Sequence, residues 1–418
     1  MGRKGRFVTA LAALALVASV AASTASGARH ASHATPGVTA TTIHIGGTFP
    51  LTGVASLYKV IPAAEGAYFA YINAHGGVNG RKIDFTVLDD AYDPSKTVPL
   101  TQQLVEQDGI FADFGSLGTA PNLSIWGYLN QHKVPQVLIA TGDSYWGFSA
   151  KKYPWTMGYQ PDYPGEGKVY GKYIAANTPN AKVGVLYQND AFGKNYFAGL
   201  RVGLGAKKSQ IVASQSYDPT QTSLVQQILA LKAAGADTLV IFALPSQAIT
   251  AMVTATKVGW SPQIFLGNVS ANPLFLQIAA QNGANVNGVI STGYLVDALN
   301  ASQANLPGVK LMKSIISTYA PPLVSDMNGG DANVPYGLGA AWTFVYALQH
   351  AGKNPTRASL MKALKSMNNV KDPFLYQGIT LNTSAKDNFP TEQEILVKWS
   401  GGASGDFTAF GKLYSGVR

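Results

Sequence analysis

The chain has 418 residues, enough for two or three domains of ordinary size. Charged residues make up only 13% of the sequence and hydrophobic residues 46%, with 44 glycines and 22 prolines, which indicates a globular protein rich in turns and excludes a disordered chain. The formal net charge of +9 comes from lysines and arginines that are scattered in ones and twos, so no basic stripe for nucleic acid is present. Cysteine is absent, which excludes disulfides, a thiolate metal site and a lipid anchor on an N-terminal cysteine.

The first 28 residues predict a cleavable export signal. Arg3, Lys4 and Arg6 precede an apolar run that is too short for a membrane span, and small residues follow it up to Ala28, where cleavage is expected. Residues 29–41 consist mostly of small and polar residues and are expected to form a flexible lead-in. The mature protein is therefore expected to be soluble in the periplasm or outside the cell.

From Thr41 onward, strand patterns and helix patterns alternate along the chain. Strands are expected at 42–46, 82–88, 110–114, 134–140, 182–187, 210–217, 238–242 and 263–266, each followed by a helical pattern. The last third is rich in helices, at 306–319, 336–351 and 356–367, and ends with strand-like runs at 379–381 and 395–399. This repetition predicts an α/β fold with two doubly wound parallel sheets.

Residues 110–122 (IFADFGSLGTAPN) are the most informative stretch. An apolar run breaks at Gly115 and enters a helix that has Pro121 in its first turn and Thr119 as the expected N-cap. The unpaired N–H groups and the positive end of the helix dipole would suit a carboxylate or another small anion. The alternative is a tight, capped turn without a ligand. The spacing excludes a nucleotide P-loop.

Ligands of open α/β sheets bind beyond the carboxyl ends of the strands. The loops at those ends contain aromatic, hydroxyl, glycine and amide residues and few acids or bases, which favours a binding cleft. Asp89, Asp90 and Asp93 form an acidic cluster that either caps the following helix or binds a cation. No metalloprotease pair, serine-hydrolase elbow or complete dinucleotide fingerprint is present, although a catalytic triad assembled in space stays open.

Four segments carry a family resemblance: 43–53 (IHIGGTFPLTG), 71–80 (YINAHGGVNG), 88–94 (LDDAYDP) and 185–193 (VLYQNDAFG). They resemble the leucine/isoleucine/valine-type periplasmic binding proteins of ABC importers. The resemblance implies a non-enzymatic, monomeric protein without a cofactor, whose partners are a small solute and a membrane permease. It also implies two lobes that are joined by three crossovers and close on the ligand. The first lobe would comprise 42–157 and 291–372, and the second 158–290 and 373–412.

Position by position, the resemblance assigns the ligand site. Tyr58 matches a cleft tyrosine, and the turns at 117–119 and 140–142 match the two turns whose backbone N–H and hydroxyl groups hold the ligand carboxylate. Both turns are expected near the protein surface. Asn268 occupies the place of the acid that neutralises the α-ammonium group in amino-acid binders. The residues expected to contact the ligand are Tyr58, Leu117, Gly118, Thr119, Ala140, Thr141, Gly142, Phe192, Phe242, Leu244 and Asn268.

The leading hypothesis is an exported solute-binding protein for a small carboxylate, with an aromatic or other organic acid favoured because Asn268 carries no charge. A branched-chain or other amino acid is the alternative ligand, with Asp162 or Asp190 as the nearest partners for its ammonium group. A secreted α/β enzyme and a sensor or receptor module are the alternative functions.

Overall fold

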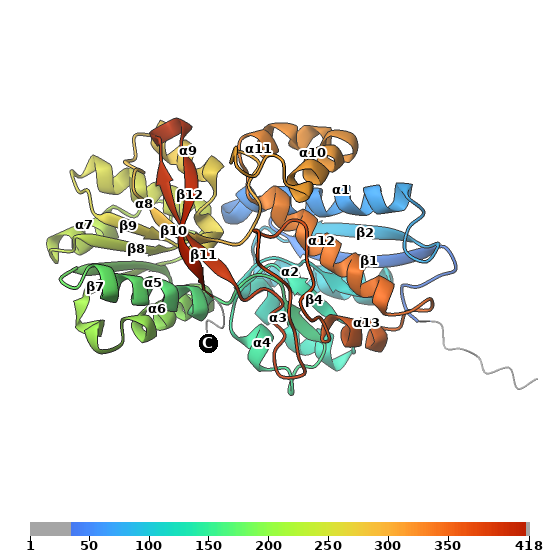
Figure 1. The fold of residues 1–418 in the computed structure, drawn as a ribbon. Coiled ribbons are helices and arrows are strands. Elements are labelled where there is room, and N and C mark those ends of the chain that lie inside the picture. The colour runs from blue at the N-terminus through green and yellow to red at the C-terminus, as the bar shows by residue number, and fades with distance from the viewer. Residues whose placement is uncertain (1–34, 415–418) are drawn as a thin grey trace, which may run out of the picture. The chain divides into compact units, whose positions relative to one another are not determined.

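The computed structural model describes residues 35–414, so the expected export signal and the start of the lead-in lie outside the described residues. Two sheets organise this part of the chain (Figure 1). Between residues 35 and 414, no helix combines the length and the apolar character that crossing a membrane requires.

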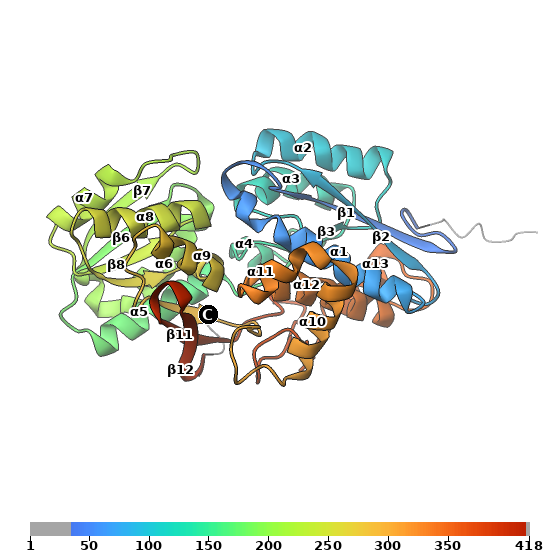
Figure 2. The ribbon, with the colours of Figure 1, turned by 90° about the horizontal axis from the view of Figure 1, so that it is seen from above.

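The first sheet has five parallel strands in the order β2-β1-β3-β4-β5. Its strands are β1 (Thr42–Phe49), β2 (Lys82–Asp89), β3 (Asp113–Phe114), β4 (Gln136–Ile139) and β5 (Thr156–Gly158). One face packs against α1 (Val60–Ala74), α10 (Pro307–Tyr319), α12 (Asn333–His350) and α13 (Arg357–Leu364). Helices α2 (Pro94–Gln102) and α3 (Thr119–Gln131) lie on the opposite side, as Figure 2 shows.

The second sheet has seven strands in the order β12-β11-β10-β9-β8-β6-β7, all parallel except β11, which runs antiparallel to both neighbours. Its strands are β6 (Val183–Gln188), β7 (Ile211–Tyr217), β8 (Thr238–Phe242), β9 (Gln263–Leu266), β10 (Ile290–Gly293), β11 (Glu394–Ser400) and β12 (Asp406–Tyr414). The fold is therefore the predicted α/β arrangement of two doubly wound sheets.

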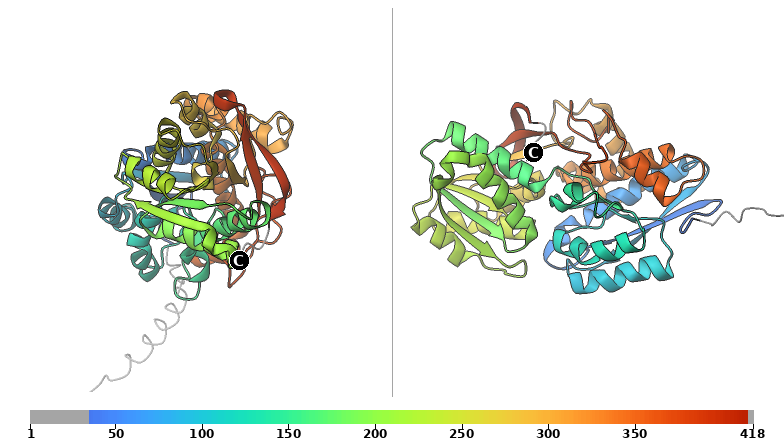
Figure 3. Two further views of the ribbon diagram at one scale, coloured as in Figure 1. Left: turned by 90° about the vertical axis from the view of Figure 1, so that its left-hand side faces the viewer. Right: turned by 90° about the horizontal axis from the view of Figure 1, so that it is seen from below.

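Alternation along the buried strands explains why helices cover both faces of the second sheet (Figure 3). Val240 and Phe242 of β8 pack in one core with α5 (Tyr163–Asn177) and α6 (Ala191–Leu204). Leu239 and Ile241 point to the other core, which contains α7 (Val225–Ala233), α8 (Pro245–Lys257) and α9 (Pro273–Gln281).

Three expectations about the chain's path are wrong. The chain was expected to pass between the sheets at 288–291, but 290–293 form β10, and the side chain of the next residue, Tyr294, packs in the core of the first sheet. The expected strand at 379–381 makes only an isolated bridge through Leu381. Phe374 and Ile379 also belong to the first core, although 373–412 were expected in the second lobe; within that range, only β11 and β12 belong to the second sheet. The strand-like pattern at 379–381 reflects packing against the first core and not pairing in a sheet.

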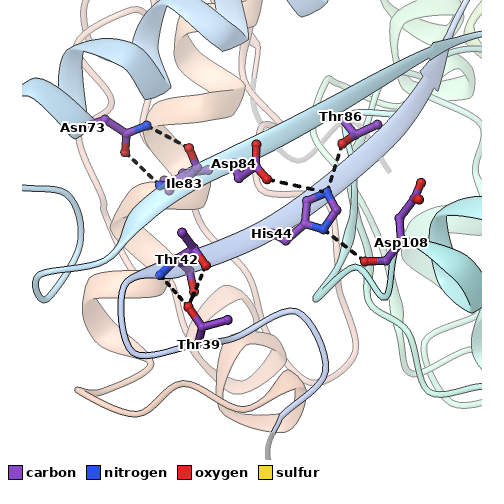
Figure 4. A network of polar contacts seen from close by, with 8 residues as sticks. All are labelled: Thr39, Thr42, His44, Asn73, Ile83, Asp84, Thr86 and Asp108. Carbon is purple, nitrogen blue, oxygen red and sulfur yellow. Dashed lines mark hydrogen bonds and ion pairs between the residues drawn. The ribbon is translucent and has the colours of Figure 1, made fainter.

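The described part of the lead-in is held in place by hydrogen bonds, contrary to the expected flexibility. The Thr39 and Thr42 hydroxyls lie 2.6 Å apart (Figure 4). Val38 forms a bridge with Ile43. In the same view, His44 of β1 contacts the Thr86 hydroxyl at 2.9 Å and the Asp108 carbonyl at 3.2 Å. Both ring nitrogens of this histidine therefore have partners.

The acidic cluster acts as a set of turn caps. Asp93 is the N-cap of α2 and accepts from the Ser95 N–H at 2.9 Å. Asp89 accepts from the Thr52 hydroxyl at 2.6 Å, and the buried Asp90 accepts from the Thr97 hydroxyl at 2.8 Å. These bonds support the capping interpretation of the three carboxylates.

Candidate ligand-binding site

A cavity lies between the carboxyl ends of the strands of the first sheet and those of the second. Residues that follow β1, β3, β4, β6, β8 and β9 line it, as the topology of open α/β sheets requires. The cavity has a volume of about 60 Å³, which is room for roughly four to six water molecules. The lining residues are Tyr58, Ile61, Tyr92, Leu117, Gly118, Thr119, Ala140, Gln160, Tyr163, Phe192, Leu244, Asn268, Val269, Asn272, Tyr294, Leu295, Ala332, Asn333 and Tyr336.

Eight of the eleven residues that the sequence singled out line this cavity: Tyr58, Leu117, Gly118, Thr119, Ala140, Phe192, Leu244 and Asn268. Thr141, Gly142 and Phe242 do not. Phe242 ends a buried strand and stacks on Tyr196 with ring centroids 4.7 Å apart. Gly142 packs so closely on the Tyr163 ring that an added Cβ would lie 2.8 Å from it.

The turn before α3 differs from the expected cap. Gly118, with φ of +105°, is the N-cap, and Thr119 is the first helical residue. The Thr119 hydroxyl lies 2.6 Å from the Thr141 hydroxyl, so Thr141 sits one layer farther from the cavity. Both threonines are buried, with 1% and 0% of their surface exposed, which corrects the expectation that these turns lie near the surface.

Most backbone N–H groups that the resemblance assigned to the ligand already have acceptors. The Leu117 N–H donates to the Thr48 carbonyl at 3.0 Å, and the Gly118 N–H donates to the Ala140 carbonyl at 3.2 Å. The Ala140 N–H donates to the Ser116 carbonyl at 3.0 Å. The first bond extends the pairing of β3 with β1, and the other two extend the pairing of β3 with β4 beyond the strand ends. Among the polar groups of these turns, the Thr119 hydroxyl is therefore more accessible from the cavity than the paired amides are.

Tyr163 adds a third hydroxyl at this end of the cavity. Burial raises the pKa of Tyr163 to about 12, while hydrogen bonds to Thr141, to the Gly142 backbone and to Thr119 act in the opposite direction. The phenol is therefore neutral at physiological pH and can donate a hydrogen bond. Together, Thr119, Thr141 and Tyr163 form a buried hydroxyl cluster.

Four aromatic residues of the lining were missed by the sequence analysis: Tyr92, Tyr163, Tyr294 and Tyr336. Tyr92 follows β2 and Tyr294 follows β10, so the rule that selected the other loops could have found them. Tyr336 lies within α12 and has no such signal; its hydroxyl donates to Gln160 Oε1 at 3.1 Å.

Asn268 is fixed by a carboxylate that does not line the cavity. Its N–H donates to Glu166 Oε1 at 2.6 Å, and its side-chain amide donates to the Thr292 carbonyl. Glu166 also accepts from the Tyr170 and Tyr196 hydroxyls, and burial raises the pKa of Glu166 to about 7. The acid thus holds the Asn268 backbone in place, and the cavity is lined by a neutral amide.

The two halves of the cavity are joined by direct hydrogen bonds. The Tyr58 hydroxyl donates to the Val269 carbonyl at 3.0 Å. Asn195 of α6 donates to Asp143 Oδ2 at 3.0 Å, and its amide oxygen lies 2.9 Å from the Ser144 hydroxyl. These contacts connect loops of the first sheet with loops of the second, as in a closed cleft.

Comparisons with known proteins agree with this architecture. The family model described as "Periplasmic binding protein" matches residues 42–404. The Leu/Ile/Val-binding protein homolog 2 of Brucella abortus is 23% identical over 90% of this chain and 95% of its own length. Homolog 3 of Brucella melitensis and homolog 7 of Brucella abortus align over little more than half of their own length.

Solved structures show the same fold at low sequence identity. The fatty acid ABC transporter substrate-binding protein from Thermomonospora curvata is 23% identical, with a TM-score of 0.76, and the match covers 90% of this chain and 94% of that one. The solute binding protein of an ABC transporter from Rhodopseudomonas palustris BisB5, in complex with 3,4-dihydroxy benzoic acid, is 20% identical with a TM-score of 0.74. That match covers 90% of this chain and 98% of the other. The chain belongs to the periplasmic binding protein family, whose members are not enzymes but bind small solutes for ABC-type transport.

Proposed function

We propose that this protein captures a small carboxylate with an apolar or aromatic body and delivers it to the permease of an ABC importer. The observation that carries the proposal is the chemistry of the cavity. Its lining contains no Asp, Glu, Lys, Arg or His, but six aromatic side chains and a hydroxyl cluster at one end. Such a lining suits a ligand whose single polar end accepts hydrogen bonds.

The hydroxyl cluster and the start of α3 would hold the carboxylate. Thr119 and Tyr163 line the cavity, and both can donate hydrogen bonds to a carboxylate. Thr119 and Ala120 are the first residues of the 13-residue α3, where N–H groups have no acceptor within the helix and the dipole favours a negative charge. The apolar body would then lie among Tyr58, Phe192 and Leu244.

An α-ammonium group would find no counter-charge in this lining. An unpaired buried charge costs several kcal/mol, so an amino acid should bind more weakly than the same acid without its amino group. Asp162 and Asp190, the alternative partners suggested by the sequence, do not line the cavity. Asp190 caps α6 and accepts from Gln188 Nε2 at 2.6 Å.

A branched-chain amino acid is the second candidate ligand. It is favoured by the full-length alignment with a Leu/Ile/Val-binding protein homolog. The ligands named in the two structural neighbours above are carboxylic acids, which supports the carboxylate. A further neighbour with the same fold, a branched chain amino acid ABC transporter from Thermus thermophilus, holds bound valine, so the neighbours do not decide against the ammonium group.

Matched ligand pairs test the proposal by calorimetry on ligand-free protein. Leucine against 4-methylpentanoate isolates the ammonium group, and benzoate against benzamide isolates the carboxylate. We expect 4-methylpentanoate to bind at least about tenfold more tightly than leucine, and benzoate more tightly than benzamide. Micromolar binding of leucine, isoleucine or valine would overturn the aromatic and organic-acid preference in favour of the amino-acid alternative.

A further inference from the structure

A second cavity lies directly beside the ligand cavity. Its volume is about 100 Å³, compared with about 60 Å³ for the first cavity. Four residues line both cavities: Asn268, Tyr294, Leu295 and Ala332. A ligand confined to the first cavity would therefore leave a larger space unfilled on the other side of these residues.

We infer that the second cavity receives the distal part of the ligand, so that the solute is an elongated carboxylate with an apolar tail. The inference rests on the proposed function, because it takes the hydroxyl cluster as the site of the carboxylate. The tail would pass between Asn268 and Tyr294. The class of ligand is thus a medium-chain or aryl-alkyl acid and not a compact acid.

The chemistry of the second lining suits such a tail. Met312 of α10, Met327 of α11 (Val324–Asn328) and Phe407 of β12 line it, together with further aliphatic residues of β11. Methionine side chains are flexible and adapt to chains of different shape. An elongated ligand would therefore bury apolar surface in both the first and the second cavity.

The acids of this lining are already engaged by protein groups. Asp331 Oδ1 accepts from Asn272 Nδ2 at 2.6 Å and from the Asn333 N–H at 2.8 Å. Asp297 Oδ1 accepts from the Leu299 N–H at 2.8 Å. These bonds leave the apolar residues to contact the tail, which favours an alkyl or aryl chain over a second charged group.

A chain-length series tests the inference. For the full mature protein, calorimetry with straight-chain acids from butanoate to octanoate should show affinity rising about fourfold for each added methylene. Ala298→Leu and Ala271→Leu each add bulk to the second cavity from a different segment. Either variant should lower octanoate affinity at least tenfold and leave butanoate affinity within twofold. Met327→Ala should shift the optimum to longer chains. Ala206→Leu, at an exposed position that lines neither cavity, is the matched control.

The outcomes separate this inference from the proposed function. Butanoate and benzoate that bind, with no gain for longer acids or no effect of the two filling variants, would overturn the tail inference alone. A Thr119→Val variant should lower the affinities for butanoate and octanoate by the same factor. Octanoate affinity that is unchanged in this variant would show a separate binding site and would also overturn the tail inference. If no acid of the series binds, the proposed function fails and the inference fails with it.

Discussion

At the scale of single residues, the site depends on which hydroxyl groups share hydrogen bonds. The Thr119 and Thr141 oxygens lie 2.6 Å apart in a buried place, and only one of the two residues lines the cavity. Each hydroxyl can donate one hydrogen bond. If the Thr141 hydroxyl donates to the Thr119 oxygen, the Thr119 hydroxyl can still donate to a ligand. Thr141 is thus expected to orient Thr119 without touching the ligand.

Replacing these threonines should affect binding and folding together. Thr119→Val removes a charge-assisted hydrogen bond to the proposed carboxylate and should weaken binding by about 1.5–3 kcal/mol. Thr141→Val leaves the Thr119 hydroxyl without its partner and should lower the free energy of unfolding by about 1–3 kcal/mol, with a smaller loss of affinity. Calorimetry with 4-methylpentanoate and urea unfolding measure the two effects. Thr39→Val, in an exposed hydroxyl pair far from the cavity, is the control. Unchanged affinity in both variants would reduce the turn to a structural cap.

At the scale of elements, α3 is positioned by the backbone geometry of the residue that precedes it. Gly118 has φ of +105°, a conformation that side chains with a Cβ rarely adopt, and an added Cβ would lie 2.5 Å from the Tyr92 ring. Gly127, within the same helix, is exposed and has open space around its missing Cβ. The backbone conformation and the close contact with Tyr92 therefore require a glycine at 118, whereas neither requires one at 127.

Alanine at these two positions should act with opposite sign. Gly118→Ala imposes backbone strain and pushes Tyr92, so we expect about 1–3 kcal/mol of lost stability and weaker ligand binding. Gly127→Ala should raise the free energy of unfolding by about 0.5–1 kcal/mol and leave binding unchanged, because alanine favours the helix interior. Thermal and urea unfolding of the two variants, with ligand titrations, give the comparison. Equal effects from both would contradict the special role of Gly118.

At the scale of the whole described chain, the hydrogen bonds across the cavity indicate a closed state. Tyr58, which packs in the core of the first sheet, and Asn195 of α6 each contact a loop of the opposite sheet. The sequence predicted that 42–157 and 291–372 move as one body relative to 158–290, and this motion stays a prediction. Given the packing of Phe374 and Ile379, we propose that residues 374–381 move with the first sheet.

Weakening one closing contact should shift the balance between open and closed states. In the wild-type protein, small-angle scattering should show compaction when a saturating ligand is added. Asn195→Ala loses two hydrogen bonds across the cavity, each of which contributes about 0.5–1.5 kcal/mol, so its ligand affinity should fall at least about fivefold. The compaction at saturation should persist, because Asn195 does not line the cavity. Asn177→Ala, on the exposed end of α5, is the control. An absence of compaction with every ligand that binds would refute closure.

The sequence alone determined the elements and the edge where the site lies. Apolar periodicity is a local property, so it predicted β8 at 238–242 and β9 at 263–266 with the bounds that the structure has. The parallel order of the strands then placed the ligand loops at their carboxyl ends, and most of the selected residues line the cavity for that reason.

Only the tertiary structure decided which groups of those loops are free to bind. The Leu117 N–H donates to the Thr48 carbonyl, and the Thr141 hydroxyl pairs with Thr119 behind the cavity wall. These hydrogen-bond partners lie on segments that are distant in sequence. Tyr336 reaches the site from a helix, and Ile379, in a run expected to form a strand, packs in the first core without joining a sheet. A local pattern records that a side chain is buried, but the partner against which it packs follows from the arrangement of the whole chain.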